Sequence, residues 1–422
     1  MPEALKRRDF LKTAALAVGP AVISARGAND KINIGWIGVG TRGYASLDWM
    51  HTACPNDVQI TAICDTYQGY IARAKDRMKT VWGTTPAVYN DYNELLADKS
   101  IDGVFIMTPE HLHHEMTLAA LKANKHIYVE KPLAHTIEEG NDIVKAAEKV
   151  NKVVQVGTQN RSSSLYKKAK ELVEQGMIGD VHFVRAFWYR NSLDNDPAWR
   201  YVIPPEANPQ NTDWARFLGP APKRPWSPER YFQWRLYWDY SGGISTDLLV
   251  HQTDIVNYML GKTLPKTCVA TGGIYRWHDD RDVPDTFSAI YEYPGDLQIN
   301  YSCYFGNDHY GYGEQLCGNE GTIEVMNRQD LYFTPETFKG KAPAKIASRQ
   351  PIHLNGKTDF GESDGAINHF RNFIASIQGK EKPIAPPLIG QQAAISGHMA
   401  TISFKSQKKL VWDEPANKYH FA

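Results

Sequence analysis

A glycine-rich loop near the beginning of the chain restricts its fold more than any other feature. Residues 31–39 form a short apolar run typical of a buried parallel strand. The run leads into a G-x-G-x-x-G motif made of Gly38, Val39, Gly40, Thr41, Arg42 and Gly43. The first glycine permits a tight turn, the second lets the backbone approach a pyrophosphate, and the third allows close packing of helix on strand. Free N–H groups at the start of the following helix then favour phosphate. Gly38, Gly40, Thr41, Arg42 and Gly43 are therefore candidates for binding a dinucleotide.

A second strand-like run over residues 58–64 ends at Asp65. This aspartate follows the third glycine by about 20 residues, which is the spacing of a dinucleotide-binding unit. A carboxylate at this place hydrogen-bonds the adenosine ribose hydroxyls and disfavours a 2′-phosphate. NAD is therefore the favoured cofactor, and Arg42 in the loop keeps NADP open as the alternative. The other role for Asp65 is a cap on the next helix.

Strand-like and helical runs alternate after this unit. Residues 101–107 and 126–132 are strand-like, and a helical pattern covers residues 112–123. The alternation extends to residue 156 and predicts a doubly wound parallel sheet, the Rossmann class of α/β fold. Ligands bind at the carboxyl ends of such strands. The residues that follow these strands are therefore further candidates for cofactor contacts: Thr108, Pro109, Glu130 and Lys131.

Four motifs give the chain a resemblance to a known family. They are the glycine loop with Asp65, the segment from Thr108 to His113, Glu130-Lys131-Pro132, and residues 242–254 with a glycine pair, Asp247, His251 and Asp254. Over nearly the whole chain they resemble the glucose–fructose oxidoreductase and inositol dehydrogenase family (Gfo/Idh/MocA). The resemblance implies a C-terminal α/β domain with an open, mainly antiparallel sheet. It also implies a sugar or sugar-derivative substrate and a homodimer or homotetramer.

The resemblance also assigns roles to single residues. Lys131 matches the family's catalytic lysine, Asp247 and His251 match its acid–base pair, and His113 matches a residue beside the nicotinamide ribose. Gln159, in the crossover between the domains, joins the expected cofactor contacts. A histidine suits the removal of an alcohol proton, and a lysine ammonium stabilises developing alkoxide charge. Asp247, four residues before His251, is placed on a helix to orient the imidazole or to bind a neighbouring hydroxyl.

The first residues carry a targeting signature. Lys6-Arg7-Arg8 and Phe10-Leu11-Lys12 precede an apolar stretch, residues 13–23, that is too short to span a bilayer. This order resembles the bacterial twin-arginine signal, which moves folded proteins. We expect a signal at 1–28, an NAD(P)-binding Rossmann domain at 31–155 and a substrate-binding and oligomerisation domain at 156–422. The C-terminal helices are candidates to pack back on its sheet, and the expected location is periplasmic or exported.

Residues 191–240 are rich in Trp, Pro and Arg, and a long loop of this kind is usually functional. Aromatic faces can stack on a sugar ring, and arginines can bind hydroxyls or a carboxylate. The candidate substrate contacts are Arg161, Trp199, Trp234 and Trp238, together with the arginines Arg200, Arg224 and Arg235. A subunit interface or a packed lid is the alternative role for this region.

Composition and charge exclude several other functions. Basic and acidic residues number 47 each, so there is no basic excess for nucleic-acid or membrane-surface binding. The mature protein is expected to have no membrane insertion. No metal is expected either, because the five cysteines lack ligand spacing and the cluster of His111, His113 and His114 lacks a Cys or carboxylate partner.

Three functions fit these features. The first is an oxidoreductase acting on a secondary alcohol of a sugar or sugar derivative, with a tightly bound cofactor that is recycled in each cycle. The second is an NAD-dependent glycosidase that oxidises a ring hydroxyl transiently. The third is a non-catalytic sugar- or nucleotide-binding protein, and the presence of Lys131, Asp247 and His251 argues against it.

Overall fold

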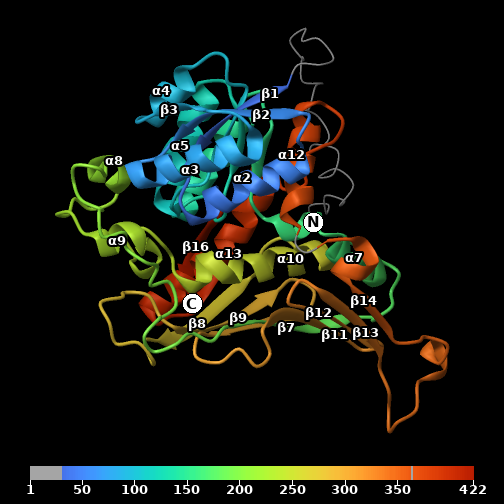
Figure 1. Ribbon diagram of the computed structural model, residues 1–422. Coiled ribbons are helices and arrows are strands. Elements are labelled where there is room, and N and C mark those ends of the chain that lie inside the picture. Colours follow the sequence, from blue (N-terminus) through green and yellow to red (C-terminus); the bar gives the residue numbers. More distant parts are fainter. Residues whose placement is uncertain (1–30, 363–364) are drawn as a thin grey trace, which may run out of the picture.

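The computed structural model describes residues 31–362 and 365–422, which form two sheets with helices between and around them (Figure 1). The signal expected at residues 1–28 lies outside the described residues. No helix within the described ranges combines the length and the apolar character needed to cross a membrane.

The first sheet is parallel and has six strands in the order β3-β2-β1-β4-β5-β6. Its strands are β1 (Ile32–Ile37), β2 (Val58–Cys64), β3 (Ala87–Tyr89), β4 (Gly103–Ile106), β5 (His126–Val129) and β6 (Val154–Val156). The connecting helices are α2 (Thr41–Ala53), α3 (Gln68–Trp82), α4 (Tyr92–Ala97), α5 (His113–Lys122) and α6 (Ile137–Ala147). The strand order reverses between β1 and β4, where doubly wound sheets bind ligands. The predicted Rossmann class is confirmed.

The second sheet has ten strands in the order β14-β13-β12-β11-β7-β10-β9-β8-β15-β16. Only β7 and β10 pair in parallel among the described strands of this sheet, so it is open and mainly antiparallel as predicted. The strands are β7 (Val181–Tyr189), β8 (Thr267–Gly273), β9 (Thr286–Tyr293), β10 (Leu297–Tyr304), β11 (Tyr312–Gly318), β12 (Gly321–Met326), β13 (Asp330–Pro335), β14 (Ile352–Asn355), β15 (Leu410–Asp413) and β16 (Lys418–Phe421).

Helices cover the face of this sheet that points toward the first domain (Figure 1). They are α7 (Ser164–Glu174), α10 (Val250–Leu260) and α13 (Pro387–Ser406), which packs on β8 and α10. Helix α12 (Ala366–Ile377) packs on α2 instead, and its Phe370 ring lies 5.3 Å from the ring of Phe105 in β4. The chain therefore returns to the first domain after it has built the second sheet.

Residues 191–240 leave the second sheet after β7 and lie across the first domain; we call this segment the strap. It contains the short helices α8 (Trp214–Leu218) and α9 (Pro228–Phe232). A third short helix, α11 (Gly356–Phe360), is not part of the strap and packs beside β14. The strap is joined to the end of β2 by backbone hydrogen bonds, from Asp213 N to Thr66 O (2.7 Å) and from Gln68 N to Asn211 O (3.0 Å). Figure 1 shows α8 and α9 at one side of both domains.

Candidate active site

One cavity runs between the two domains and is lined by the glycine loop, by the ends of the parallel strands and by the strap. At its dinucleotide end, Gly38 has a φ of +92°, which a residue with a side chain rarely adopts. A Cβ on Gly43 would lie 2.0 Å from the carbonyl oxygen of Gly38, so this position requires glycine. Helix α2 begins after Gly40, and no described side chain caps its first N–H groups. The loop therefore fits a pyrophosphate.

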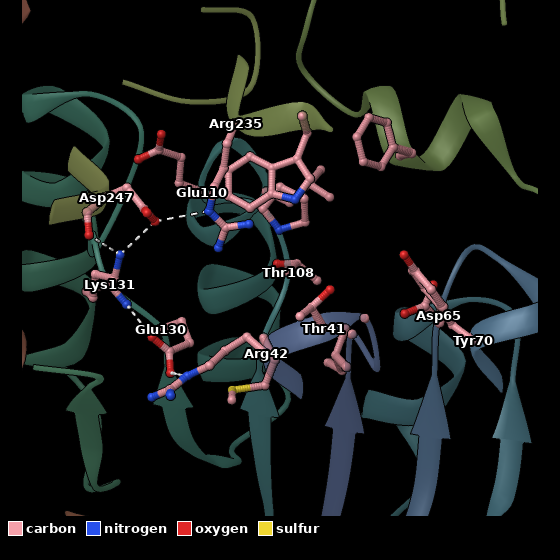
Figure 2. A pocket seen from close by; sticks show the side chains of 18 of the residues that line it. Thr41, Arg42, Asp65, Tyr70, Thr108, Glu110, Glu130, Lys131, Arg235 and Asp247 are labelled. Carbon is pink, nitrogen blue, oxygen red and sulfur yellow. Dashed lines mark hydrogen bonds and ion pairs between the residues drawn. The ribbon is translucent and has the colours of Figure 1, made fainter. Parts of the chain in front are cut away.

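Asp65 lies at the carboxyl end of β2, at the same end of the cavity (Figure 2). Its carboxylate accepts hydrogen bonds from Val39 N (2.7 Å) and Tyr67 N (3.0 Å). The hydroxyl of Tyr231, which belongs to the strap, lies 3.3 Å from the same carboxylate. Burial raises the pKa of Asp65, although the two backbone N–H groups oppose the shift. Asp65, the predicted ribose contact, therefore lies on the cavity wall, where the strap contacts it through Tyr231.

Arg42 and Glu130 also line the cavity, where they pair with each other. The guanidinium Nε of Arg42 lies 2.9 Å from Oε1 of Glu130, and its Cζ lies 4.7 Å from the ring centroid of Trp49. The pair joins the glycine loop to the end of β5. It directs Arg42 toward Glu130, and Figure 2 shows Asp65 on the opposite side of the loop.

The other end of the cavity contains three charged side chains from three distant segments (Figure 2). Nζ of Lys131 donates to Oδ1 of Asp247 (2.9 Å) and to its backbone carbonyl (2.6 Å). Nε of Arg235, in the strap, lies 3.1 Å from the same Oδ1. Burial alone would raise the pKa of Asp247, but the charges of Lys131 and Arg235 outweigh it and hold the pKa well below the usual range. Asp247 is therefore an ionised carboxylate between two cations.

Asp247 and His251 lie where the chain enters α10. Residues Ser245–Leu249 form one turn of π-helix, a widened turn that is frequent at functional sites. The imidazole of His251 lines the cavity, and its Nδ1 is buried with no hydrogen-bond partner among the described residues. Burial lowers the pKa of His251 well below its usual value, and the charges of Lys131 and Arg328 lower it further. The histidine is therefore neutral and able to accept a proton, whereas Asp247 holds Lys131 and Arg235.

Most of the predicted cofactor contacts line this cavity. Thr41, Thr108, Pro109 and Gln159 do so, as does Trp234 from the strap, whose ring lies 4.3 Å from the guanidinium of Arg235. His113 lies beneath the cavity wall, where its Nδ1 contacts Pro132 O (2.7 Å) and its Nε2 contacts Thr108 O (2.9 Å). The imidazole of His113 therefore links the loop after β4 to the loop after β5, beneath the cavity wall.

The structure does not bring Arg161, Trp199 and Trp238 to the cavity wall. Arg161 is buried, and its Nε lies 2.8 Å from Oδ1 of Asp254. Trp199 is buried 5.0 Å from the ring of Phe305, and Trp238 lies under Nζ of Lys405 at 3.9 Å. Buried ion pairs and aromatic packing account for these three side chains, so none of them is a direct substrate contact in this arrangement. No group of three or more metal-ligating side chains occurs in the described part of the chain.

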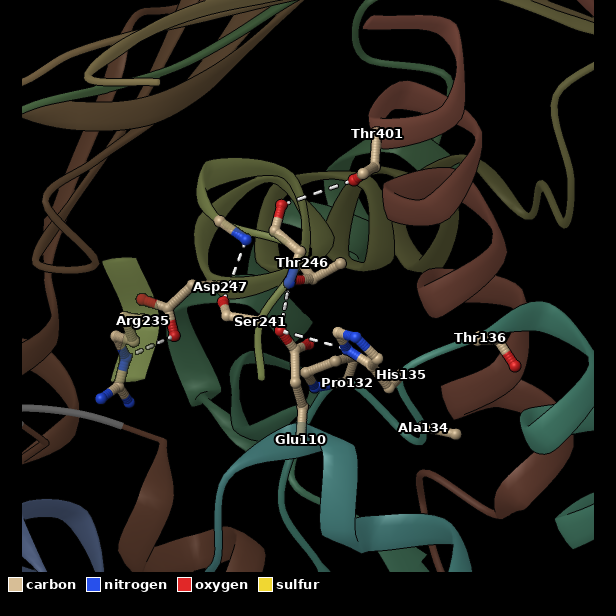
Figure 3. Close-up of polar contacts among 12 residues, drawn as sticks. Glu110, Pro132, Ala134, His135, Thr136, Arg235, Ser241, Thr246, Asp247 and Thr401 are labelled. Carbon is tan, nitrogen blue, oxygen red and sulfur yellow. Dashed lines mark hydrogen bonds and ion pairs between the residues drawn. The ribbon is translucent and has the colours of Figure 1, made fainter. Parts of the chain in front are cut away.

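Sequence reasoning missed several residues of the cavity wall. Glu110 is one of them: its Oε1 accepts hydrogen bonds from Gly242 N and from the hydroxyl of Thr246 (3.0 Å), directly before Asp247 (Figure 3). Burial raises the pKa of Glu110 to about 7. The other missed residues are Trp188, Arg190, Tyr231 and Arg328. Arg190 directly follows β7, and this position at a strand end is the signal that could have identified it, whereas Arg328 lies in a turn with no motif.

Comparison with known proteins agrees with this geometry. Models of one oxidoreductase family match the chain, its NAD-binding Rossmann fold at residues 32–158 and its C-terminal alpha/beta domain at residues 142–288 and 222–411. The chain belongs to the Gfo/Idh/MocA oxidoreductase family. The resemblance drawn from the four motifs is confirmed, and the first domain is an NAD-binding domain.

Relatives of this chain include a protein named as a dehydrogenase and proteins named as glycosyl hydrolases. A myo-inositol 2-dehydrogenase of Thermotoga maritima is 26% identical over 390 residues, which cover 91% of this chain and 99% of the relative. A glycosyl hydrolase family 109 protein of Shewanella baltica is 32% identical over 234 residues, which cover 46% of this chain and 50% of the relative. The match to this second relative thus spans only about half of its length.

Solved structures show the same fold. A levoglucosan dehydrogenase in complex with NADH and levoglucosan has a TM-score of 0.69 at 21% identity, covering 90% of this chain and 99% of that chain. An oxidoreductase domain protein from Kribbella flavida has a TM-score of 0.71 at 19% identity, covering 91% and 100%.

Proposed function

We propose that this chain is an exported oxidoreductase that oxidises or reduces a secondary alcohol of a sugar or sugar derivative, using NAD that stays bound and is recycled. One observation carries the proposal: a single cavity joins the glycine loop and Asp65 to Lys131, Asp247 and His251. A dinucleotide held by the loop thus shares one enclosed space with groups suited to alcohol chemistry. The myo-inositol 2-dehydrogenase relative supports a ring hydroxyl as the reacting group.

The residues of the substrate end divide the chemistry between them. Bound NAD supplies hydride transfer, which is the cofactor's own reaction. The ammonium of Lys131 stabilises negative charge on the alcohol oxygen as the bond to hydrogen breaks. The neutral imidazole of His251 accepts the hydroxyl proton. Asp247 holds Lys131 and Arg235 in place by ion pairs of 2.9 and 3.1 Å.

The strap supports retention of the cofactor. Several of its side chains line the cavity, among them Phe217, Tyr231, Phe232, Trp234 and Arg235. The hydroxyl of Tyr231 lies 2.7 Å from that of Thr66 at the end of β2, which ties the strap to the dinucleotide end. A dinucleotide bound below the strap leaves only when these contacts break. Retained cofactor suits an enzyme that oxidises one substrate and reduces another without free NAD.

Export is part of the same proposal. The twin-arginine signature of residues 7 and 8 belongs to a route that moves folded proteins, so the cofactor can be bound before export. We expect the protein in the periplasmic fraction of expressing cells, and in the cytoplasm when Arg7 and Arg8 are both changed to Lys. Periplasmic recovery of that double variant would contradict export by this route.

A second function is favoured by the match to glycosyl hydrolase family 109 proteins. In that case the enzyme oxidises a ring hydroxyl, which eases loss of a neighbouring substituent, and then restores the alcohol. The same Lys131, His251 and retained NAD serve both reactions. The two functions differ in products, because the glycosidase releases an aglycone with no net oxidation.

Native mass spectrometry after extensive buffer exchange tests the proposal directly. We expect one dinucleotide per chain, and turnover of sugar pairs without added NAD. Release of an aglycone from a glycoside in the same solution, with no oxidised sugar, would select the glycosidase. Chains that emerge empty and need free NAD for every turnover would overturn cofactor recycling, while leaving the oxidoreductase assignment in place.

A further inference from the structure

We propose that the substrate is a disaccharide or longer saccharide, whose reacting unit lies at Lys131 and His251 while the next sugar unit binds in a second cavity beyond Arg190. This inference rests on the proposed sugar oxidoreductase function and adds the size of the substrate. The second cavity binds the hydroxyl groups and the ring face of the additional sugar unit.

The second cavity lies where β7 ends. Strand β7 is placed between β10 and β11 in the sheet, so the connection from β10 to β11, residues 305–311, passes over the end of β7. This connection, the end of β7 and the turn after β12 line a cavity of about 550 Å³. Sites for small molecules measure roughly 300–1,000 Å³, so the space is large enough for a sugar unit.

The second cavity adjoins the active-site cavity at Arg190, whose side chain lines both. The guanidinium of Arg190 lies 5.0 Å from the ring centroid of Trp188, which belongs to the active-site wall. The ring of Trp188 lies 6.0 Å from that of His251, and it stacks at 4.4 Å on the ring of Tyr312, which lines the second cavity. One layer of aromatic side chains therefore separates the proposed base from the second cavity.

The guanidinium of Arg190 is available to a ligand. It has no hydrogen bond or ion pair among the described residues, although the backbone N–H of Arg190 donates to Tyr304 O (3.0 Å). By contrast, Arg200, Arg224 and Arg230 are all paired with aspartates. A guanidinium has five N–H donors, so Arg190 can donate to oxygens of sugar units in both cavities.

The other side chains of the second cavity suit a neutral saccharide. They combine a carboxylate, two amides, an imidazole and phenol rings, from Asp308, Asn191, Asn327, His309, Tyr189 and Tyr310. The ring of Tyr310 is 57% exposed and offers an apolar face to a sugar ring. The carboxylate of Asp308 makes no hydrogen bond or ion pair within the described ranges. Arg190 and Asp308 supply opposite charges, which favours a ligand with hydroxyls over an ion.

The two cavities differ in exposure in the way that an extended substrate requires. His251 is buried, whereas Asn191, Asp308 and Asn327 are exposed. The reacting unit is therefore held away from water, which protects hydride transfer from side reactions. The open cavity lets a longer saccharide continue into solvent without any change at the reacting unit.

Isothermal titration calorimetry on the full, NAD-loaded chain tests the inference. The ligand pairs are cellobiose with methyl β-glucoside, maltose with methyl α-glucoside, and lactose with methyl β-galactoside, because the members of each pair differ only in the second sugar unit. For the sugar that the protein accepts, we expect the disaccharide to bind roughly tenfold to a hundredfold more tightly, as a few added hydrogen bonds do. This preference should fall to within about threefold in a double variant, Asp308→Ala with Tyr310→Ala.

The matched control is Tyr332→Ala, since Tyr332 is another exposed tyrosine of the second sheet and lines neither cavity. It should keep the full preference for disaccharides. Equal binding of disaccharide and methyl glycoside by the unchanged protein would overturn the inference, as would equal weakening of both ligands in the double variant. A double variant that keeps the preference but loses its oligomeric state, seen by native mass spectrometry, would assign the second cavity to contact between copies of this chain.

The absorbance of reduced nicotinamide separates this inference from the proposed function. Tighter binding of disaccharides without reduction of the bound cofactor by any saccharide would defeat the oxidoreductase function and leave the second sugar site standing. Reduction by methyl glycosides and disaccharides that bind equally well would defeat the second sugar site and leave the function standing.

Discussion

The two ends of the cavity are built in different ways. The dinucleotide end uses backbone groups and one carboxylate from a single stretch, residues 38–65. The substrate end uses side chains from the end of β5, the strap, the turn of π-helix, the end of β7 and the turn after β12. A site made of backbone is specified by nearby sequence, whereas a site made of distant side chains depends on how the two domains pack. The predictions below test each end separately.

Removal of the lysine at the substrate end should have the largest effect. Lys131→Met deletes the ammonium that lies 2.9 Å from Asp247, so we expect turnover to fall roughly 10³-fold, as for loss of a charge-stabilising group. Bound NAD, measured by native mass spectrometry, should remain. Lys122→Met, at an exposed position near the end of α5, is the control and should keep full activity. Turnover of the Lys131 variant within tenfold of normal would remove the lysine from the mechanism.

The dinucleotide end should respond to glycine substitutions in two distinct ways. A methyl group on Gly43 would overlap the carbonyl of Gly38, so Gly43→Ala should destabilise the fold by roughly 1–3 kcal/mol and abolish NAD binding. The nearest protein atom to a methyl on Gly40 is 3.5 Å away, in Tyr70, so Gly40→Ala should fold normally and lose only NAD affinity. Thermal unfolding and NAD titration distinguish the two. Normal NAD binding by both variants would refute a backbone-built phosphate site.

Arg235 connects the strap to the substrate end, and its loss should act through Asp247. Without this cation the pKa of Asp247 rises, so the ion pair with Lys131 is lost at a higher pH as the solution is acidified. For Arg235→Met we expect kcat to fall roughly tenfold and the acidic limb of the pH–rate profile to move to higher pH. Arg235→Lys should restore part of both effects.

The control for this prediction is Arg224→Met, because Arg224 also lies in the strap but binds Asp239 and does not line the cavity. It should leave the pH–rate profile in place. A lower kcat in the Arg235 variant with an unmoved acidic limb would show that Arg235 acts on the substrate and not through Asp247.

The smallest effect on turnover is expected from a change at Glu110, which lies in the cavity wall between the two ends. Burial raises the pKa of Glu110 to about 7, so the protonated form stabilises the fold. That contribution is complete below the unfolded pKa of about 4.5 and is lost as the pH rises through 7. Glu110→Gln copies the protonated form. Its unfolding free energy, from urea titrations, should exceed that of the unchanged protein by roughly 3 kcal/mol at pH 8 and match it near pH 4.5. A difference that does not vary with pH would contradict the shift.

Several features could be predicted from the sequence because they rest on local geometry. Gly38 needs a positive φ, Gly43 needs close packing, and Asp65 follows the first glycine loop at a fixed spacing; all three lie where the motif puts them. Lys131, Asp247 and His251 were found through the family motifs. Their convergence on one cavity is a finding of the structure. Asp247 and His251 both line the cavity, as their i, i+4 spacing predicted, but Asp247 binds two cations instead of the imidazole.

The substrate contacts were harder to predict. Trp199 and Trp238 satisfied the pattern of sugar-stacking residues, yet both are used in packing. Arg161 satisfied the pattern of an anion-binding residue, yet it is paired with Asp254. Composition shows that a segment is rich in aromatic and basic side chains, and it does not show which of them face a cavity.

The sequence by itself determined the Rossmann domain, the dinucleotide motif and the membership of the chain in its family, because each depends on residues close together in the chain. Only the tertiary structure decided that the strap covers the cavity, that Arg235 joins Lys131 at Asp247, and that Arg190 and Arg328 meet at Trp188. These contacts join residues that are distant in sequence. Their geometry follows from the packing of the two domains against each other, which no local pattern specifies.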